Sequence, residues 1–416
     1  MSLSVAPVRF RPGVPAADPA ATRERWIRRG VGLTWGLLVL NTLTFATGTW
    51  NDLPLIIHIP SVVGKLITQG ALPAALLVAV AINRRLSIRP NVYMCLLSLL
   101  VVVAFMSGLH PLGHVIGTMY RTFRLAGFVA TLWLLTPWWG RPDMLLLRCQ
   151  LKALMVVIAS VLLGLIVAPG RALAQGRLSG EFWPMPPAQV ADFGAILAGL
   201  VIILWFCGVM RGRVAAPLIA VAVPVLLLTH TRIEVVALLA GVLVGGLSIF
   251  LSRARVRRAF VATGLVVSVG ITVFSGLITA WLTRGESSQE LNSLTGRTAV
   301  WNGVVNAPRD LFQVIFGYGL SNKAYNGFPI DSNWLATYLD LGLLGVAICA
   351  VLLLYVFVSA YFQPIDVQRA LALFLVVYLM ITSYTETGLG DASEYMLDLA
   401  LAASLLVPPI TRWRAG

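Results

Sequence analysis

The chain has 416 residues, of which 58% are hydrophobic and only 12% are charged, and its mean hydropathy is +0.86. A soluble domain carries about twice that share of charged residues, and it could not bury so much apolar surface, so the composition excludes a soluble protein. Lysine and arginine together number 31 against 17 acidic residues, a net charge of +14. In a chain this apolar, the basic excess indicates membrane topology rather than nucleic-acid binding.

Apolar runs of roughly 20 residues, the length that crosses a bilayer core of about 30 Å, recur along the chain. The sequence therefore predicts an all-α integral membrane protein with about twelve transmembrane helices. The expected spans are 30–48, 60–83, 91–108, 115–137, 150–169, 188–210, 214–230, 233–251, 259–281, 334–359, 370–385 and 395–410.

These spans divide the chain into five parts. Residues 1–29 are expected to form a cytoplasmic tail without a cleavable signal peptide, because they are too long and too polar for one. The first nine transmembrane helices are expected within 30–281, and the last three within 334–410. Between them, 282–333 is expected to be a long extracytoplasmic loop, and 411–416 is a second cytoplasmic tail.

The basic residues predict the orientation, because they gather in alternate connections between the expected spans. The positive-inside rule places that side, and both termini, in the cytoplasm. We therefore expect a multi-pass protein of the cytoplasmic membrane. The arginines of these connections are Arg84, Arg85, Arg89, Arg141, Arg148, Arg211, Arg213, Arg253, Arg255, Arg257 and Arg258.

The sequence gives little sign of a metal site, a disulfide or a cofactor. The four cysteines lie in apolar runs and form no CxxC pair. His110 and His114 are four residues apart, but Pro111 and Gly113 between them favour a turn over a helical metal site.

Charged residues on the expected outer side are few, and they come from distant parts of the chain. A single charge at the membrane centre costs about 2.5–3.5 kcal/mol on insertion scales. Near the interface the cost is smaller, so any one of these residues could be structural; Arg232, for example, could pair with Glu234. Together they favour a polar cavity that binds an anion. The group comprises Arg177, Glu181, Arg232, Glu234, Arg297, Asp331, Glu386 and Asp391.

These residue types suit one reaction. The planar guanidinium of arginine binds phosphate oxygens through two hydrogen bonds and keeps its charge, so Arg177, Arg232 and Arg297 could hold a lipid-linked diphosphate and stabilise the charge that develops as it leaves. A carboxylate beside them could accept the proton of an acceptor hydroxyl. The pattern predicts metal-independent glycosyl transfer from a polyprenyl-diphosphate donor.

Further residues are expected to contact the substrate. Arg121 and Arg124, inside the fourth span, either line the same cavity or bind lipid phosphates. The segment 298–319 shows a helical pattern that is expected to lie over the membrane surface. Its candidate apolar contacts are Trp301, Val304, Val305, Leu311, Phe312 and Ile315. The candidate substrate contacts are Asn333, Glu234, Arg124, Arg121, Trp301, Tyr318 and Glu386.

Over residues 170–350 the sequence resembles the O-antigen ligase/polymerase family of membrane glycosyltransferases. The resemblance lies in a GR-x-x-x-W opening, a G-x-G turn, a short polar motif and a helix with Gly-Leu-x-Gly, and Arg232 in THTRIEV takes the position of a family arginine. The matching residues of the long segment are Gly296, Arg297, Trp301, Gly317, Gly319, Asp331, Ser332, Asn333, Gly342, Leu343, Leu344 and Gly345.

The resemblance implies a GT-C-like fold and an inverting transfer, without a metal or other cofactor, from an undecaprenyl-diphosphate-linked glycan to an acceptor glycan or lipid. In the family's ligases a histidine at the position of Asp331 is taken as the base, so the resemblance implies that Asp331 is the base or orients the acceptor. The aspartate favours a surface- or exopolysaccharide polymerase. A ligase that transfers the finished glycan remains an alternative. A transporter or lipid flippase is the other, although transporters usually show inverted repeats and broken helices near mid-membrane.

Overall fold

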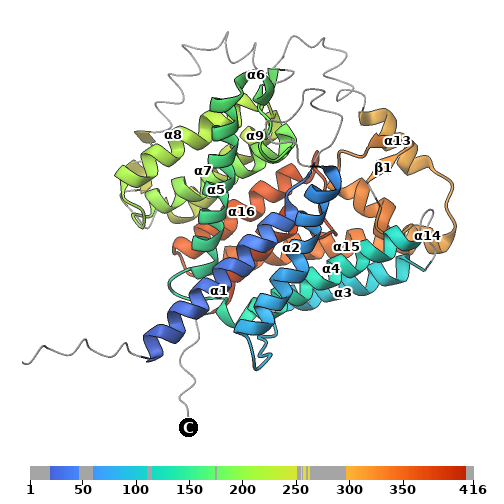
Figure 1. Ribbon diagram of the computed structural model, residues 1–416, viewed down its shortest axis with the longest axis horizontal. Helices are drawn as coiled ribbons and strands as arrows, with labels where there is room; N and C mark the ends of the chain where they lie inside the picture. Colours follow the sequence, from blue (N-terminus) through green and yellow to red (C-terminus); the bar gives the residue numbers. More distant parts are fainter. Residues whose placement is uncertain are drawn as a thin grey trace, which may run out of the picture.

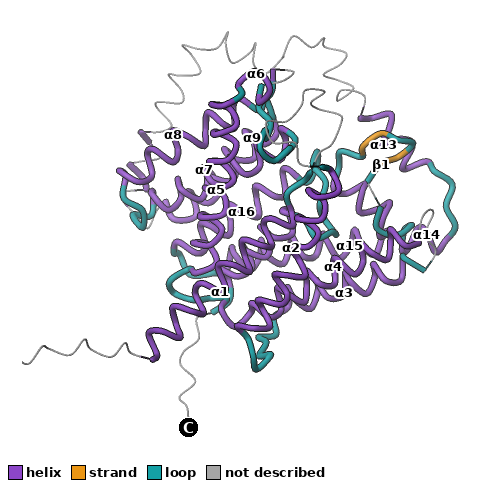
Figure 2. Tube along the Cα trace, in the orientation of Figure 1, coloured by secondary structure: helices purple, strands orange, loops and turns teal. Residues whose placement is uncertain are grey.

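The computed structural model describes residues 19–45, 60–109, 115–173, 176–250, 254, 256–258, 261–262, 297–321 and 323–408. Within these ranges the regular structure is helical, apart from one two-stranded antiparallel hairpin, β1 (Ala324–Tyr325) and β2 (Phe328–Pro329) (Figure 2). The prediction of an all-α protein is confirmed for the described part of the chain.

The first helices pack in pairs. α1 packs against α2 and α5, and α4 packs against α2 and α3 (Figure 1). The bounds of this group are α1 (Pro19–Thr42), α2 (Ser61–Ile82), α3 (Val92–Ser107), α4 (Val115–Leu135), the 3-10 turn η1 (Thr136–Trp138), α5 (Leu145–Val167) and the short α6 (Pro169–Ala172).

Among the remaining helices, α16 packs against α9, α7, α15 and α17. The small helices α13 and α14 lie with β1 on the side of the molecule opposite α8 (Figure 1). The bounds are α7 (Pro187–Phe206), α8 (Gly212–Leu228), α9 (Arg232–Phe250), α13 (Arg297–Asn306), α14 (Leu311–Phe316), α15 (Asn333–Phe362), α16 (Val367–Thr382) and α17 (Glu394–Leu406).

Five of the described helices are long and apolar enough to cross a membrane. Large apolar side chains such as Leu66, Val156 and Leu354 face outward on them, as expected of surfaces that contact lipid. Every expected span except 259–281 overlaps a described helix; 259–281 lies outside the described residues except at 261–262. The five helices comprise Val62–Ile82, Leu145–Val167, Pro187–Phe206, Arg232–Phe250 and Asn333–Phe362.

The first helix starts earlier than expected. α1 begins at Pro19 instead of near residue 30, so part of the segment expected to be a tail is helical. The segment contains two alanines and four arginines, residues that favour helix. Arg28 also pairs with Glu24, one turn before it, with 2.8 Å between Nε and Oε1.

The helix expected as one span near 334–359 is broken. α15 has non-helical backbone at Gly342, where φ is +65°. The break removes helical partners from the preceding carbonyl groups, and the loop after α14 replaces them. The backbone nitrogens of Tyr318 and Gly319 donate to the carbonyl oxygens of Leu339 and Asp340, both over 2.9 Å. A buried helix break is therefore satisfied by backbone from a neighbouring segment.

Two glycines permit this close approach. A Cβ atom on Gly342 would lie 2.3 Å from the carbonyl oxygen of Ile315, and one on Gly317 would lie 2.5 Å from the carbonyl of Asp340. Both glycines also have positive φ, which other residues adopt at a cost. The loop and the break thus depend on each other.

The helical pattern of 298–319 forms two helices instead of one, because Pro308 lies between α13 and α14. Asp310 caps α14 through a capping box with Gln313. Of the expected apolar contacts, Val304 is fully buried, whereas Leu311 is 76% exposed. Both helices pack against α15, and α14 also packs against α3.

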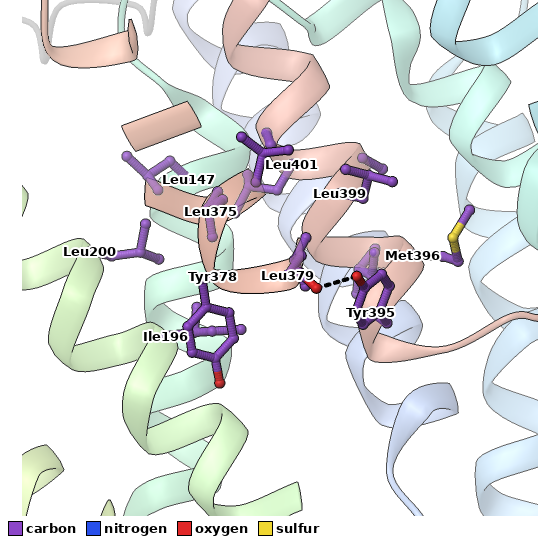
Figure 3. Close-up of a cluster of buried hydrophobic side chains, with 14 of the residues drawn as sticks. Leu147, Ile196, Leu200, Leu375, Tyr378, Leu379, Tyr395, Met396, Leu399 and Leu401 are labelled. Carbon is purple, nitrogen blue, oxygen red and sulfur yellow. Dashed lines mark hydrogen bonds between the residues drawn. The ribbon is translucent and has the colours of Figure 1, made fainter. Parts of the chain in front are cut away.

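The core around α16 joins several helices. Leu147, Ile196, Leu200 and Leu375 come together from α5, α7 and α16 (Figure 3). In the same view, the hydroxyl group of Tyr378 points away from the leucine side chains. One polar side chain thus extends from the apolar core.

Candidate functional site

The central feature of the candidate site is an ion pair between the start of α13 and the loop that leads into α15. Arg297 is the first residue of α13, and Asp331 lies two residues before α15. Nε of Arg297 donates to Oδ2 of Asp331 over 3.1 Å, and the two side chains are 32% and 36% exposed. Two residues predicted to be catalytic are therefore in direct contact and accessible.

Hydrogen bonds join the start of α15 to the connection between α16 and α17. The amide oxygen of Asn333 accepts a hydrogen bond from the backbone nitrogen of Leu389 over 2.6 Å. Its own backbone nitrogen donates to the carbonyl of Ser383, and the indole of Trp334 donates to the Ser383 hydroxyl over 3.0 Å. Because Asn333 is fully buried, it positions this connection; the expectation was a substrate contact.

That connection carries Glu386, which is partly buried. Burial is the main cause that raises the pKa of Glu386, to about 8, and the carboxylates of Asp192 and Asp331 raise it further, while Arg297 and Arg177 lower it. Glu386 therefore lies within electrostatic reach of both arginines and of Asp331, as the sequence predicted.

Arg177 comes from the connection between α6 and α7. Its Nε donates to the carbonyl oxygen of Thr229 over 2.9 Å, and its Nη2 donates to the hydroxyl of Thr231 over 3.3 Å. Burial lowers the pKa of Arg177, Glu386 raises it, and Arg297 lowers it. Arg232 follows Thr231 directly and begins α9, so its backbone adjoins the threonine that Arg177 contacts.

A second polar group lies within the helices. The hydroxyl of Tyr378 on α16 is 2.8 Å from Oδ1 of Asp192 on α7, and it is also hydrogen-bonded to Oε2 of Glu234 on α9. Glu234 is fully buried. Its bonded oxygen faces α16, so Glu234 belongs to an interior network, although it was expected to contact the substrate.

Arg121 and Arg124 belong to a different group of charges, around Asp391. Arg124 donates from Nη2 to the carbonyl of Ala392 over 3.1 Å, and Nζ of Lys323 lies 3.8 Å from Oδ2 of Asp391. Burial alone would raise the pKa of Asp391, but Lys323, Arg124 and Arg121 together hold it below its usual value. The two arginines thus surround a carboxylate.

Arg124 also forms hydrogen bonds to the end of α1. Its Nε donates to the side-chain oxygen of Asn41 over 3.2 Å, and its Nη2 donates to the carbonyl of the same residue over 3.0 Å. These contacts link α4, the end of α1 and the start of α17, so they stabilise the packing of three helices.

The two predicted aromatic contacts have different environments. The ring of Trp301 meets that of Tyr384 edge-on, with 5.4 Å between the centroids, and Tyr384 is exposed. Tyr318 is 8% exposed, and its hydroxyl donates to the carbonyl of Pro308 over 3.2 Å. Arg309 stacks on its ring, with 5.2 Å to the centroid. Tyr318 therefore stabilises the α13–α14 corner, which differs from the predicted substrate contact.

The predictions did not include Asp192, Tyr378 or Lys323. A carboxylate in an otherwise apolar helix is the signal that would have singled out Asp192. Tyr378 and Lys323 carry no such signal, because tyrosine is common in apolar helices and lysine in loops.

Among the residues that the structure describes, no three histidine, cysteine, aspartate or glutamate side chains come close enough to hold a metal ion. No model of a known protein family matches this chain, and no curated protein sequence matches it.

Proposed function

We propose that this protein is a membrane glycosyltransferase of the polymerase type, which extends a glycan carried on a polyprenyl diphosphate. The observation that carries the proposal is the accessible ion pair of Arg297 with Asp331, with Arg177 and Glu386 within electrostatic reach. An arginine pair beside two carboxyl groups matches the needs of a reaction in which a diphosphate leaves and a hydroxyl loses its proton.

Arg297 can bind Asp331 and a phosphate of the donor at the same time. A guanidinium has five N–H donors, and the bond from Nε to Asp331 leaves the two terminal nitrogens for a phosphate. Arg177 and Arg232 supply further positive charge for the diphosphate. At neutral pH Glu386 is mostly protonated, because its pKa is about 8, so it adds little negative charge beside the diphosphate and can donate a hydrogen bond.

The proposed reaction is a single displacement. The acceptor hydroxyl oxygen forms a bond to the anomeric carbon, while the bond from that carbon to the diphosphate oxygen breaks on the opposite side. The hydroxyl proton passes to the carboxylate of Asp331, and polyprenyl diphosphate leaves with the electron pair. The configuration at the anomeric carbon is inverted.

The proposed topology has twelve spans with both termini in the cytoplasm, because the basic connections then share one side. Arg177, Arg297, Asp331 and Glu386 fall on the opposite side of that topology, at the outer face of the cytoplasmic membrane. A donor there would keep its polyprenyl tail among membrane lipids and its diphosphate at the arginines.

Transport is the second candidate, and the break of α15 at Gly342 is the observation that favours it, because transporters bind substrates at broken helices. In a transporter, however, the freed backbone groups are available to the substrate. Here the carbonyls of Leu339 and Asp340 accept hydrogen bonds from Tyr318 and Gly319. The protein's own backbone satisfies the freed carbonyls, which favours a glycosyltransferase over a transporter.

The test is the size of the glycan that accumulates on the carrier lipid in cells that lack the protein. A polymerase predicts single repeat units, restored to long chains by the wild-type gene and not by Asp331→Ala. Long polymer stranded on the carrier would instead identify a ligase. An unchanged distribution on the outer face would contradict both enzymes.

A further inference from the structure

A groove between α1 and α5 lies apart from the candidate site. It has a volume of about 560 Å³. The residues that line it recur every three or four positions on both helices, so one stripe of each helix forms a wall. The lining residues are Arg28, Arg29, Gly32, Gly36, Val39, Leu40, Leu43, Leu145, Arg148, Cys149, Lys152, Ala153, Val156 and Val157.

One end of this groove is strongly basic. Arg28 is already engaged, because it lies 2.8 Å from both Glu24 and Asp143. Arg29, Arg148 and Lys152 are exposed, and within the described part of the chain no acidic side chain pairs with them. Arg29 and Arg148 lie near the start of the groove and Lys152 lies one helical turn further along α5, and no acidic side chain of the described residues matches these three cations.

The rest of the groove is apolar and is open because of two glycines. A Cβ atom on Gly36 would meet nothing within 4 Å, and one on Gly32 would lie 3.7 Å from Sγ of Cys149. Val156 is 70% exposed along the same stripe. Beyond its basic end, the groove is therefore apolar and has room beside both glycines.

The dimensions fit one leaflet of a bilayer. Eleven residues separate Arg29 from Leu40, which at about 1.5 Å per residue is roughly 16 Å of helix. Half of a hydrocarbon core is about 15 Å. We propose that this groove binds an acidic phospholipid, with its phosphate at Arg29, Arg148 and Lys152 and an acyl chain along Gly32 and Gly36.

Charge complementarity selects this occupant. A phosphodiester supplies the anion that the three cations lack, and its acyl chain covers apolar surface that a soluble anion would leave exposed. Basic pockets between transmembrane helices bind acidic lipid head groups in this way. A helix from a second copy of the chain would cover the groove but would leave the cations unmatched unless it carried acidic residues there.

The test uses the full-length protein in detergent, with native mass spectrometry after addition of either phosphatidylglycerol or phosphatidylcholine. Wild-type protein is expected to retain phosphatidylglycerol and to retain at least about fivefold less phosphatidylcholine. Gly36→Leu fills the groove, and Gly70→Leu is its matched control, because a Cβ on Gly70 also meets nothing within 4 Å. Gly36→Leu should lose the bound lipid and Gly70→Leu should keep it.

A pair of charge variants tests the basic end. Arg148→Gln with Lys152→Gln should lower retention of phosphatidylglycerol about fivefold or more. Arg84→Gln with Arg85→Gln removes the same charge from exposed residues outside the groove and should retain lipid as the wild type does. Equal retention of the two lipids by the wild type, unchanged binding in Gly36→Leu, or an equal loss in both charge pairs would overturn the proposal.

Discussion

The guanidinium of Arg297 lies 3.1 Å from the carboxylate of Asp331, a residue 34 positions further along the chain. Both side chains are about one-third exposed, and an exposed ion pair contributes only about 0–1 kcal/mol to stability. Stability alone therefore explains little of this contact, and a role in chemistry explains more.

Removal of either member of this pair should separate activity from stability. Asp331→Asn and Arg297→Gln should each lower glycan extension about 100-fold or more, while the free energy of unfolding changes by about 1 kcal/mol or less. The matched control is Arg141→Gln, which breaks a partly exposed pair with Glu24 of 2.6 Å and should leave extension unchanged. Normal extension in Asp331→Asn would remove the pair from the mechanism.

Glu386 predicts a dependence of stability on pH. Its pKa in the folded protein is about 8, above the ordinary value of 4.5. The folded state therefore binds more protons than the unfolded state between these values, so this contribution to stability is complete below pH 4.5 and is lost as the pH rises through 8. The melting temperature, measured from pH 5 to 9, should fall less steeply with rising pH for Glu386→Gln than for the wild type.

Parallel curves for the two proteins would mean that Glu386 titrates normally. The same carboxyl group should affect activity, because its ionisation adds negative charge beside Arg177 and Arg297. Extension by the wild type should therefore decline above about pH 8, the pKa of this group, and Glu386→Gln should shift or abolish that decline.

The break in α15 should tolerate only glycine. In Gly342→Ala the new methyl group would lie 2.3 Å from the carbonyl oxygen of Ile315, at a residue with φ of +65°. We expect a loss of roughly 1–3 kcal/mol or more in stability. Gly70→Ala, on the open face of α2, should be neutral or stabilising by up to about 1 kcal/mol. Thermal unfolding in detergent compares them, and equal melting temperatures would contradict the assigned geometry.

Tyr378 should be required for the interior network. Its hydroxyl has one hydrogen but contacts two carboxyl groups, those of Asp192 and Glu234, so one of these must donate a hydrogen bond to the phenol oxygen. Tyr378→Phe leaves both buried groups without this partner and should cost about 1–3 kcal/mol. Tyr361→Phe, at an exposed tyrosine, is the control and should change stability little.

The helices themselves could be predicted from the sequence, because apolar runs of membrane length are strong signals. The meeting of Arg297 with Asp331 was also expected, since both lie in one segment whose motif pattern suggested a site. The positions of Arg177 and Glu386 on the same expected side of the membrane predicted that they lie near this pair.

The break at Gly342 could not be predicted from hydropathy, because the helix Asn333–Phe362 is long and strongly apolar and Asp340 is its only charged residue. Its cause is a loop contact with Gly317, which depends on tertiary structure. Likewise, the burial of Tyr318 and Asn333 depends on partners such as Pro308 and Leu389. Local patterns carry no information on such distant partners.

The most direct test of the account is extension of a polyprenyl-diphosphate-linked glycan by the purified protein, measured for the wild type and for Arg297→Gln and Asp331→Asn. The wild type is expected to form longer lipid-linked chains and to release polyprenyl diphosphate without added metal, while both variants, folded and of normal melting temperature, should release about 100-fold less or none. Chain extension at the wild-type rate by either folded variant would contradict this account.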